Sequence, residues 1–257
     1  MAPIIPTVSP FEQTAIALLE RDTPTTVRIN GLRQEDVEAA WQGLFRFDAE
    51  ASDRDRERWE VYVERDPDFK EPDDGVVGKK KTDRKKYLHW RPDLDDLLKR
   101  RGVTLERWQH EWFAHCERIH SACYETLRKL AQQMDEARPG FSFEKRVMDW
   151  SHMHCLRVLK YDPRPGVVAR THTDRCAVTL HLAESAKGLY AWRGWEAILC
   201  PTPTLPEAWC FTGQKVEKIT RGAVPAVYHE VRDGTGGLDP RWAVVYFGQM
   251  PKDSGAY

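Results

Sequence analysis

The sequence lacks several features that would assign it at once to a common class of protein. Acidic and basic residues nearly balance, with a formal net charge of -1, so no strong field indicates nucleic acid or an anionic membrane as a partner. No run of residues is long and apolar enough for a membrane span. The first residues, Met1-Ala-Pro-Ile-Ile-Pro6, have no charged region or apolar core that would indicate a signal peptide. We therefore expect a cytoplasmic protein that binds neither nucleic acid nor membranes.

Cysteine pairs of the kind that bind zinc or carry redox chemistry are also absent. None of the six cysteines stands in a CxxC pair, and their spacing fits no zinc framework. They are Cys116, Cys123, Cys155, Cys176, Cys200 and Cys210. Without a secretory signal we expect reduced thiols, most of them small core residues.

Tryptophan and proline, in contrast, are plentiful. Ten Trp and sixteen Pro in 257 residues favour a loop-rich, aromatic-lined architecture over a helical bundle. The length is normal for one barrel or sandwich, so we expect a single domain over residues 1–257.

The first part of the chain, to about residue 140, is predicted to be mostly helical. Apolar residues recur at three- and four-residue steps in its helices. The predicted helices are Phe11–Leu19, Gln34–Phe45 and the long Thr104–Met134, with a short β-rich run at Thr25–Ile29. Three histidines of the long helix are five residues apart and do not share one face, so we interpret them as ordinary helix residues. They are His110, His115 and His120.

A polar, irregular segment, Asp66–Arg84, interrupts this part and carries the basic run Lys79-Lys80-Lys81. Such a run is usually a solvated face. The alternative is a mobile lid that brings a cation to an acidic substrate. The sequence leaves both interpretations open.

From about residue 141 onward, short β-rich runs alternate with Pro and Gly. This regular spacing is typical of an all-β sandwich or barrel, which the helices of the first part would brace. The runs are Cys155–Lys160, Cys176–Leu182, Leu189–Trp192, Trp195–Leu199, Ala208–Phe211, Ala226–Val231 and Trp242–Phe247.

Three residues of the β part form a candidate metal site. His172 and Asp174 are two positions apart, so in extended chain their side chains project to the same side. His229 follows at the end of another predicted strand. Two histidines and one carboxylate on one face of an ion leave its other positions open, as Fe(II) oxygenases require for a co-substrate and dioxygen.

Two further residues are placed to bind a carboxylate beside that ion. Arg241 opens the strand that follows His229, and its planar fork can hold a carboxylate; alternatively it is a surface cation. Tyr161 ends the predicted strand Leu156-Arg-Val-Leu-Lys-Tyr161. It can donate a second hydrogen bond to the same carboxylate, or it is a half-buried strand aromatic.

In this order the motifs resemble the isopenicillin-N-synthase-like, plant-type branch of the 2-oxoglutarate/Fe(II) oxygenases. The resemblance runs through Leu156-Arg-Val-Leu-Lys-Tyr-Asp-Pro163, His172-Thr-Asp174 and Lys187-Gly-Leu189 to Val227-Tyr-His229 and Arg241. It implies a double-stranded β-helix, or cupin-like jelly roll, over about residues 141–257. It also implies Fe(II) bound by His172, Asp174 and His229, and 2-oxoglutarate bound by Arg241 and Tyr161.

The activity implied by the resemblance is a dioxygenase reaction. Dioxygen and 2-oxoglutarate are consumed, succinate and CO2 are released, and a C–H bond of a small molecule is oxidised, most often by hydroxylation. Ascorbate is the expected reductant in vitro. Related halogenases lack the carboxylate ligand, so Asp174 predicts oxygenation rather than halogenation. No catalytic residue beyond the iron ligands is expected.

The chain departs from this family at two points, and other functions remain open. The family usually has Ser where this chain has Ala243, and often Gly-Asp where it has Gly213-Gln214. One alternative is an oxidase or cyclase of the same family that needs no 2-oxoglutarate. Others are a non-catalytic metal-binding jelly roll and a zinc hydrolase, which would need a general base.

The substrate is the least defined part of the prediction. A small metabolite fits the compact size, for instance an amino acid or an intermediate of specialised metabolism. The predicted substrate-binding residues are Arg157, Arg175, Tyr190, Trp192 and Phe247, with Trp195 as a further aromatic of the same pocket. Aromatic residues on β-strands are more often part of the core, and an arginine on a strand is more often simply exposed.

Overall fold

The computed structural model describes residues 10–52, 54–55, 59, 85–163 and 165–251. The segment Asp66–Arg84 lies outside the described residues, so both interpretations of its basic run stay predictions. None of the described helices is long and apolar enough to cross a membrane.

Helices dominate the first part of the described chain. The elements are α1 (Pro10–Glu20), β1 (Thr25–Arg28), α2 (Gln34–Glu50), β2 (Lys85–Trp90), α4 (Leu94–Arg100), α5 (Arg107–Ala137), α6 (Phe143–Asp149) and the 3-10 helix η1 (Ser151–Met153). The long helix predicted from the apolar periodicity is confirmed as α5, shifted three residues toward the C-terminus at each end.

Strands dominate the second part. They are β3 (Cys155–Tyr161), β4 (Val167–His172), β5 (Val178–Glu184), β6 (Leu189–Arg193), β7 (Glu196–Leu199), β8 (Glu207–Thr212), β9 (His229–Arg232) and β10 (Arg241–Gly248), with helix α7 (Gln214–Ile219) between β8 and β9. Five elements were not predicted from the sequence: β2, β4, α4, α6 and α7. The three helices are only six or seven residues long, too short for a periodic pattern to be distinctive.

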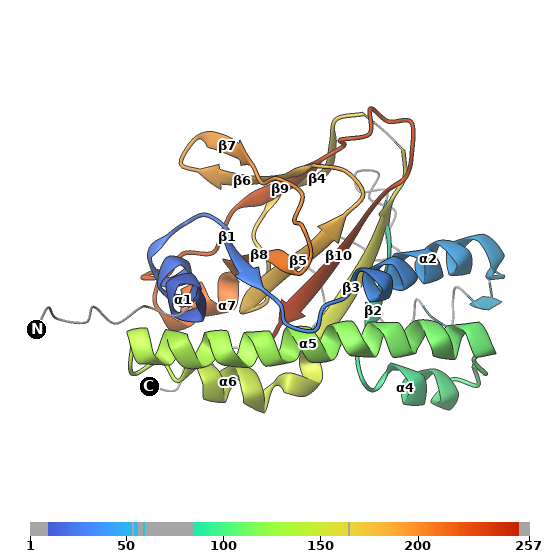
Figure 1. The fold of residues 1–257 in the computed structure, drawn as a ribbon, viewed down its shortest axis with the longest axis horizontal. Coiled ribbons are helices and arrows are strands. Elements are labelled where there is room, and N and C mark those ends of the chain that lie inside the picture. Colours follow the sequence, from blue (N-terminus) through green and yellow to red (C-terminus); the bar gives the residue numbers. More distant parts are fainter. Residues whose placement is uncertain (1–9, 53, 56–58, 60–84, 164, 252–257) are drawn as a thin grey trace, which may run out of the picture.

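The strands form two antiparallel sheets. The large sheet has the order β1-β8-β5-β10-β3-β2 and the small sheet the order β4-β9-β6-β7. In Figure 1 the small sheet lies above the large one, and α5 runs along the opposite side with the other helices around it. This is the predicted double-stranded β-helix braced by helices.

Strand alternation gives the large sheet two buried faces. On β10, Val244 and Tyr246 pack with the helices, whereas Ala243, Val245 and Phe247 pack toward the small sheet. The helix layer therefore covers one face of the large sheet, and the other face lines the interior between the two sheets. The interior face carries the candidate site.

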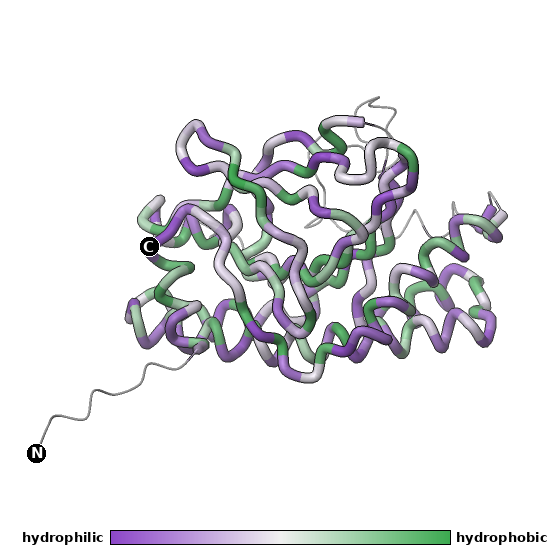
Figure 2. Tube along the Cα trace, turned by 45° about the horizontal axis from the view of Figure 1, so that its top comes forward, coloured by the Kyte–Doolittle hydropathy of each residue, from purple (hydrophilic) through white to green (hydrophobic). Residues whose placement is uncertain are grey.

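The helix layer is held by close packing between α2 and α5. Figure 2 shows hydrophobic and hydrophilic positions alternating along the helices, as expected for helices with one buried face. Trp112 of α5 donates its indole N–H to the carbonyl of Ala40 at 2.8 Å. A Cβ on Gly43 would lie 2.3 Å from the Trp112 ring, so only glycine permits this approach of the two helices.

All six cysteines are buried, and none is in a disulfide. The prediction of free thiols in the core is thus confirmed.

Candidate active site

The two candidate metal histidines are neighbours across a strand pair. The register of β4 and β9 places His172 directly opposite His229, and the two ring centroids are 4.4 Å apart. Antiparallel pairing therefore brings together two residues that are far apart in the sequence.

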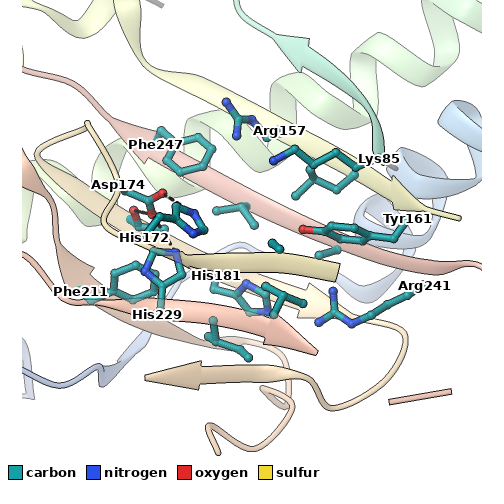
Figure 3. A pocket seen from close by; sticks show the side chains of 17 residues that line it. Lys85, Arg157, Tyr161, His172, Asp174, His181, Phe211, His229, Arg241 and Phe247 are labelled. Atoms are coloured by element: carbon teal, nitrogen blue, oxygen red, sulfur yellow. Dashed lines mark hydrogen bonds and ion pairs between the residues drawn. The ribbon is translucent and has the colours of Figure 1, made fainter. Parts of the chain in front are cut away.

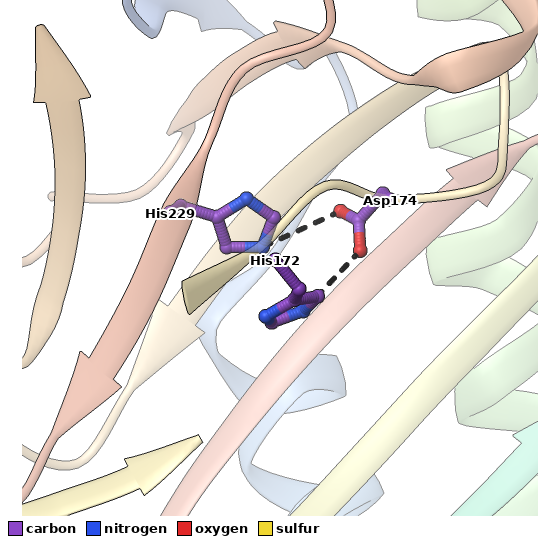
Figure 4. A group of neighbouring side chains, drawn as sticks. All are labelled: His172, Asp174 and His229. Atoms are coloured by element: carbon purple, nitrogen blue, oxygen red, sulfur yellow. Dashed lines mark ion pairs between the residues drawn. The ribbon is translucent and has the colours of Figure 1, made fainter. Parts of the chain in front are cut away.

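Asp174 completes the cluster from a loop rather than from a strand. We expected extended chain through both residues of the His-x-Asp motif, but β4 ends at His172. Even so, one carboxylate oxygen of Asp174 lies 3.8 Å from His172 Nε2 and the other lies 3.7 Å from His229 Nε2. One ligand atom from each residue lies within 4.8 Å of the others, and Figure 4 shows the three groups converging.

The hydrogen bonds around the cluster leave the right atoms available for a metal. His172 Nδ1 lies 2.6 Å from the carbonyl of Arg170, and His229 Nδ1 lies 3.1 Å from the carbonyl of Val227. An imidazole that donates through Nδ1 has its lone pair on Nε2, the atom that points at the cluster. Thr179 Oγ1 donates to Asp174 at 2.6 Å and orients the carboxylate.

Burial and charge set the protonation states that metal binding needs. Burial lowers the pKa of His229 to about 4, although the Asp174 carboxylate opposes this shift. Burial alone would raise the pKa of Asp174, but His229, His172 and the Thr179 hydrogen bond bring it below its usual value. A neutral imidazole and an ionised carboxylate are the forms that bind metal. The donor set thus fits Fe(II), and it would also fit other divalent ions.

A cavity extends from this cluster between the two sheets. Together with the solvent space at its open mouth it spans about 510 Å³. Besides the cluster, its lining consists of Lys85, Arg157, Leu159, Tyr161, Ala169, Thr179, His181, Leu189, Phe211, Val231, Arg241, Ala243, Val245 and Phe247.

One end of the cavity is formed by Arg241, which the sequence analysis singled out. The register of β10 and β3 pairs it with Tyr161, and its guanidinium carbon lies 5.4 Å from the centre of the tyrosine ring. The Arg241 side chain is 2% exposed. Its Nε and Nη1 are buried and have no hydrogen-bond partner among the described residues. Buried donors of this kind indicate a missing acceptor.

The opposite side of the cavity carries a second cationic group. Arg157 donates from Nε to Nε2 of His89, and its guanidinium lies 4.7 Å from the ring centre of Phe247. Burial lowers the pKa of His89 well below its usual value, and the charge of Arg157 adds to this effect. Figure 3 shows Arg157 and Lys85 on one side of the cavity and Arg241 on the other.

No protein-family model matches the chain, and no curated protein matches it by sequence. Solved structures, however, share its fold. The dioxygenase for auxin oxidation of Arabidopsis thaliana, solved with 2-oxoglutarate, is 14% identical, with a TM-score of 0.66 over 98% of this chain and 91% of its own. The dioxygenase for auxin oxidation of rice is 19% identical, with a TM-score of 0.65 and coverages of 95% and 78%.

A protein of Neurospora crassa also shares the fold. T7H of Neurospora crassa, solved with α-ketoglutarate, is 15% identical, with a TM-score of 0.65 over 93% of this chain and 78% of its own. The chain has the fold of the 2-oxoglutarate/Fe(II) oxygenases.

Within this oxygenase fold, the predicted substrate residues fall into two groups. Arg157 and Phe247 line the cavity, whereas Arg175, Tyr190 and Trp192 do not. Strand alternation on β6 explains the position of the last two, because Leu189 and Ala191 face the interior core. The Tyr190 ring instead lies 4.1 Å from the guanidinium of Arg232.

Trp195, predicted as a further aromatic of the pocket, is 99% exposed at the turn between β6 and β7, so it does not line the cavity.

Two polar residues in the interior of this oxygenase fold, His181 and Glu184, were not predicted from the sequence. An irregularity in the β5–β10 ladder shifts the register between Val244 and Val245. Both His181 and Glu184, three positions apart, consequently face the interior, opposite Val245 and Ala243. Regular alternation would turn one of them outward. The polar Thr179-x-His181 pattern was a usable signal for His181, but nothing in the sequence marked the bulge.

Proposed function

We propose that the chain is an Fe(II)- and 2-oxoglutarate-dependent dioxygenase that hydroxylates a C–H bond of a small molecule. The overall reaction would convert 2-oxoglutarate, dioxygen and substrate R–H into succinate, CO2 and R–OH. One observation carries the proposal: three groups that could hold a metal ion face the same cavity as a buried arginine, two of whose donors have no partner within the described part of the chain.

Each group has a defined task in this proposal. His172, Asp174 and His229 would hold the iron, which when bound supplies the activation of dioxygen at its open positions. Arg241 would bind the distal carboxylate of 2-oxoglutarate through its unpaired donors, and the Tyr161 hydroxyl would donate to the same group. Because Ala243 offers no hydroxyl on the cavity face of β10, Tyr161 carries more of this binding than in relatives with serine there.

The proposal is tested by succinate formation from 2-oxoglutarate with Fe(II), ascorbate and air. We expect iron-dependent turnover in the wild-type protein, slow when no substrate is present, and none in His172→Ala. His110→Ala, an exposed histidine of α5, is the matched control and should keep full activity. If candidate substrates and the wild-type protein give no succinate while metal still binds, a non-catalytic metal-binding jelly roll becomes the better account.

The same site predicts oxygenation rather than halogenation. Asp174 fills the position that chloride would need, and Thr179 holds its carboxylate in place. With an accepted substrate and added chloride, mass spectrometry should find hydroxylated product only. A chlorinated product would contradict the assignment of Asp174 as an iron ligand.

We also propose that the substrate is small and carries an anionic group that Arg157 binds. Arg157 is 9% exposed, and the rings of Tyr87 and Phe247 lie 5.1 and 4.7 Å from its guanidinium. The planar guanidinium of arginine matches the geometry of a carboxylate. Carboxylates such as phenylacetate should stimulate succinate formation more than the matching amides, and Arg157→Gln should remove this difference. Equal stimulation by acids and amides would contradict the proposal.

A further inference from the structure

Arg241 already has an anionic partner inside the fold, Glu184. Its Nη2 donates to Glu184 Oε2, and Glu184 is fully buried, with a side-chain exposure of 0%. Glu184 does not line the cavity, whereas Arg241 and His181 do. The Glu184 carboxylate therefore contacts Arg241 and His181 on the side away from the cavity.

Glu184 is fixed in this position from three sides. The β5 bulge turns it inward opposite Ala243. Thr202 donates to its Oε1 at 3.2 Å, and His181 Nε2 lies 3.3 Å from its Oε2. Burial alone would raise the pKa of Glu184, but His181, Arg241 and Thr202 bring it below its usual value. Glu184 is thus an anion that pairs with Nη2 of the same guanidinium whose Nε and Nη1 would bind the distal carboxylate.

We propose that Glu184 is a specificity-determining residue of the co-substrate site: it shares Arg241 with the distal carboxylate of 2-oxoglutarate and weakens the binding of that carboxylate. The inference rests on the function proposed above. In the free protein the charges of Arg241 and Glu184 cancel, so a bound dicarboxylate adds an uncompensated negative charge to a buried site. Like charges in such a site repel strongly because little water screens them.

The test compares two ligands that differ only at the distal end. 2-Oxopentanoate has the same carbon chain as 2-oxoglutarate but ends in a methyl group. Both are titrated calorimetrically into Mn(II)-loaded protein, so that binding is read without turnover. In the wild-type protein we expect the distal carboxylate to raise affinity by less than about tenfold. In Glu184→Gln we expect the affinity for 2-oxoglutarate to rise by about tenfold or more, with 2-oxopentanoate unchanged.

Two further variants show whether the gain acts through Arg241. The double variant Glu184→Gln/Arg241→Gln should lose the gain. Asp36→Asn is the matched control, because Asp36 is a 1% exposed carboxylate of the helix layer, paired with Arg33 and Arg118. It should lower stability, as Glu184→Gln should, but leave both affinities unchanged.

Several results would overturn the inference. An unchanged or weaker affinity of Glu184→Gln for 2-oxoglutarate would show that Glu184 only supports Arg241. A parallel change for both ligands would indicate a general structural effect. If Glu184→Gln does not fold, the affinities of the wild-type protein for the two ligands decide. A wild-type affinity for 2-oxoglutarate that exceeds the affinity for 2-oxopentanoate by about tenfold or more would contradict competition between Glu184 and the distal carboxylate for Arg241. If Mn(II) binds but neither ligand does, the proposed function itself fails.

Discussion

At the residue scale, the candidate site depends on the groups that hold the three candidate metal ligands as much as on those ligands themselves. Thr179 donates to Asp174 at 2.6 Å, and the two histidines are oriented by backbone carbonyls. Such contacts fix which atom points at an ion and how basic that atom is. Only the threonine contact can be removed by a side-chain substitution.

Thr179→Val should therefore weaken metal binding without abolishing it. The substitution removes the hydrogen bond but keeps the shape of the side chain, and loss of such a contact typically costs about 10- to 100-fold in affinity. Calorimetric titration with Mn(II) measures the effect. Thr179→Ser should keep the Mn(II) affinity of the wild-type protein, because serine retains the hydroxyl. Thr104→Val, at an exposed position, should leave this affinity unchanged. Unaltered affinity in Thr179→Val would mean that Asp174 needs no orientation.

A buried histidine far from the cluster gives the fold an acid sensitivity. Burial lowers the pKa of His120 to about 4, and its Nε2 has no hydrogen-bond partner among the described residues. Between about pH 6.5 and 4 the unfolded chain binds a proton that the folded chain does not. The stability that His120 contributes is therefore present above about pH 6.5 and is lost as the pH falls toward 4.

His120→Phe should reduce this loss, because phenylalanine keeps the ring contacts with Trp90 and Tyr246 but cannot bind a proton. Denaturant unfolding at pH 7 and pH 4.5 gives the free energies of unfolding. We expect the difference between the two pH values to shrink by up to roughly 3 kcal/mol. The exposed His110→Gln is the control. An equal pH dependence in wild type and His120→Phe would show that His120 is protonated in the folded state.

At the element scale, what the sequence could predict follows from periodicity. The apolar repeat of α5 and the β-rich runs that form β3 and β10 were visible in the sequence, so the helix layer, the β-core and the positions of Tyr161 and Arg241 at strand ends could be predicted. The i, i+2 motif and a distant histidine led to the three candidate metal ligands, which the structure brings within 4.8 Å of one another. The pairing of His172 with His229 could not be derived, because register depends on contacts between distant strands.

The β5 bulge and the β6 register were likewise not predictable from the sequence. A bulge changes which residues face inward without leaving a pattern in the sequence, and it hid Glu184. The orientation of Tyr190 and Trp192 away from the cavity follows from the β6 register, which the sequence alone also left undetermined.

The contact of α2 with α5 should be sensitive to one methyl group. In Gly43→Ala the new Cβ would lie 2.3 Å from the Trp112 ring, and the stacked Trp59 and Trp108 restrict how far that ring can move. Overpacking of this kind costs about 1–3 kcal/mol. Denaturant unfolding should show this loss, whereas Gln42→Ala on the exposed side of α2 should not. A stabilised Gly43→Ala protein would contradict the packing described for these helices.

At the scale of the whole molecule, the site joins the two sheets. His172 and His229 belong to the small sheet, and Arg241 and Tyr161 to the large one. A metal and a co-substrate bound between them would therefore stabilise the folded chain against unfolding.

Mn(II) with 2-oxoglutarate at a hundredfold excess over its Kd should raise the Tm by about 5–10 °C. Differential scanning calorimetry measures this shift. In His229→Ala, 2-oxoglutarate should not shift the Tm, because this variant lacks the metal ion to which the 2-oxo acid end would bind. A shift of equal size in His229→Ala or in chelator-treated protein would place 2-oxoglutarate elsewhere.

The most direct test of the central claim is a crystal structure of the protein grown without oxygen, with Fe(II) and 2-oxoglutarate. The account predicts one metal ion bound by Nε2 of His172, Nε2 of His229 and the Asp174 carboxylate. The 2-oxo acid end of the co-substrate should lie on that ion and its distal carboxylate on Arg241. A metal held by other residues, or a distal carboxylate bound to Arg157 instead, would contradict the account.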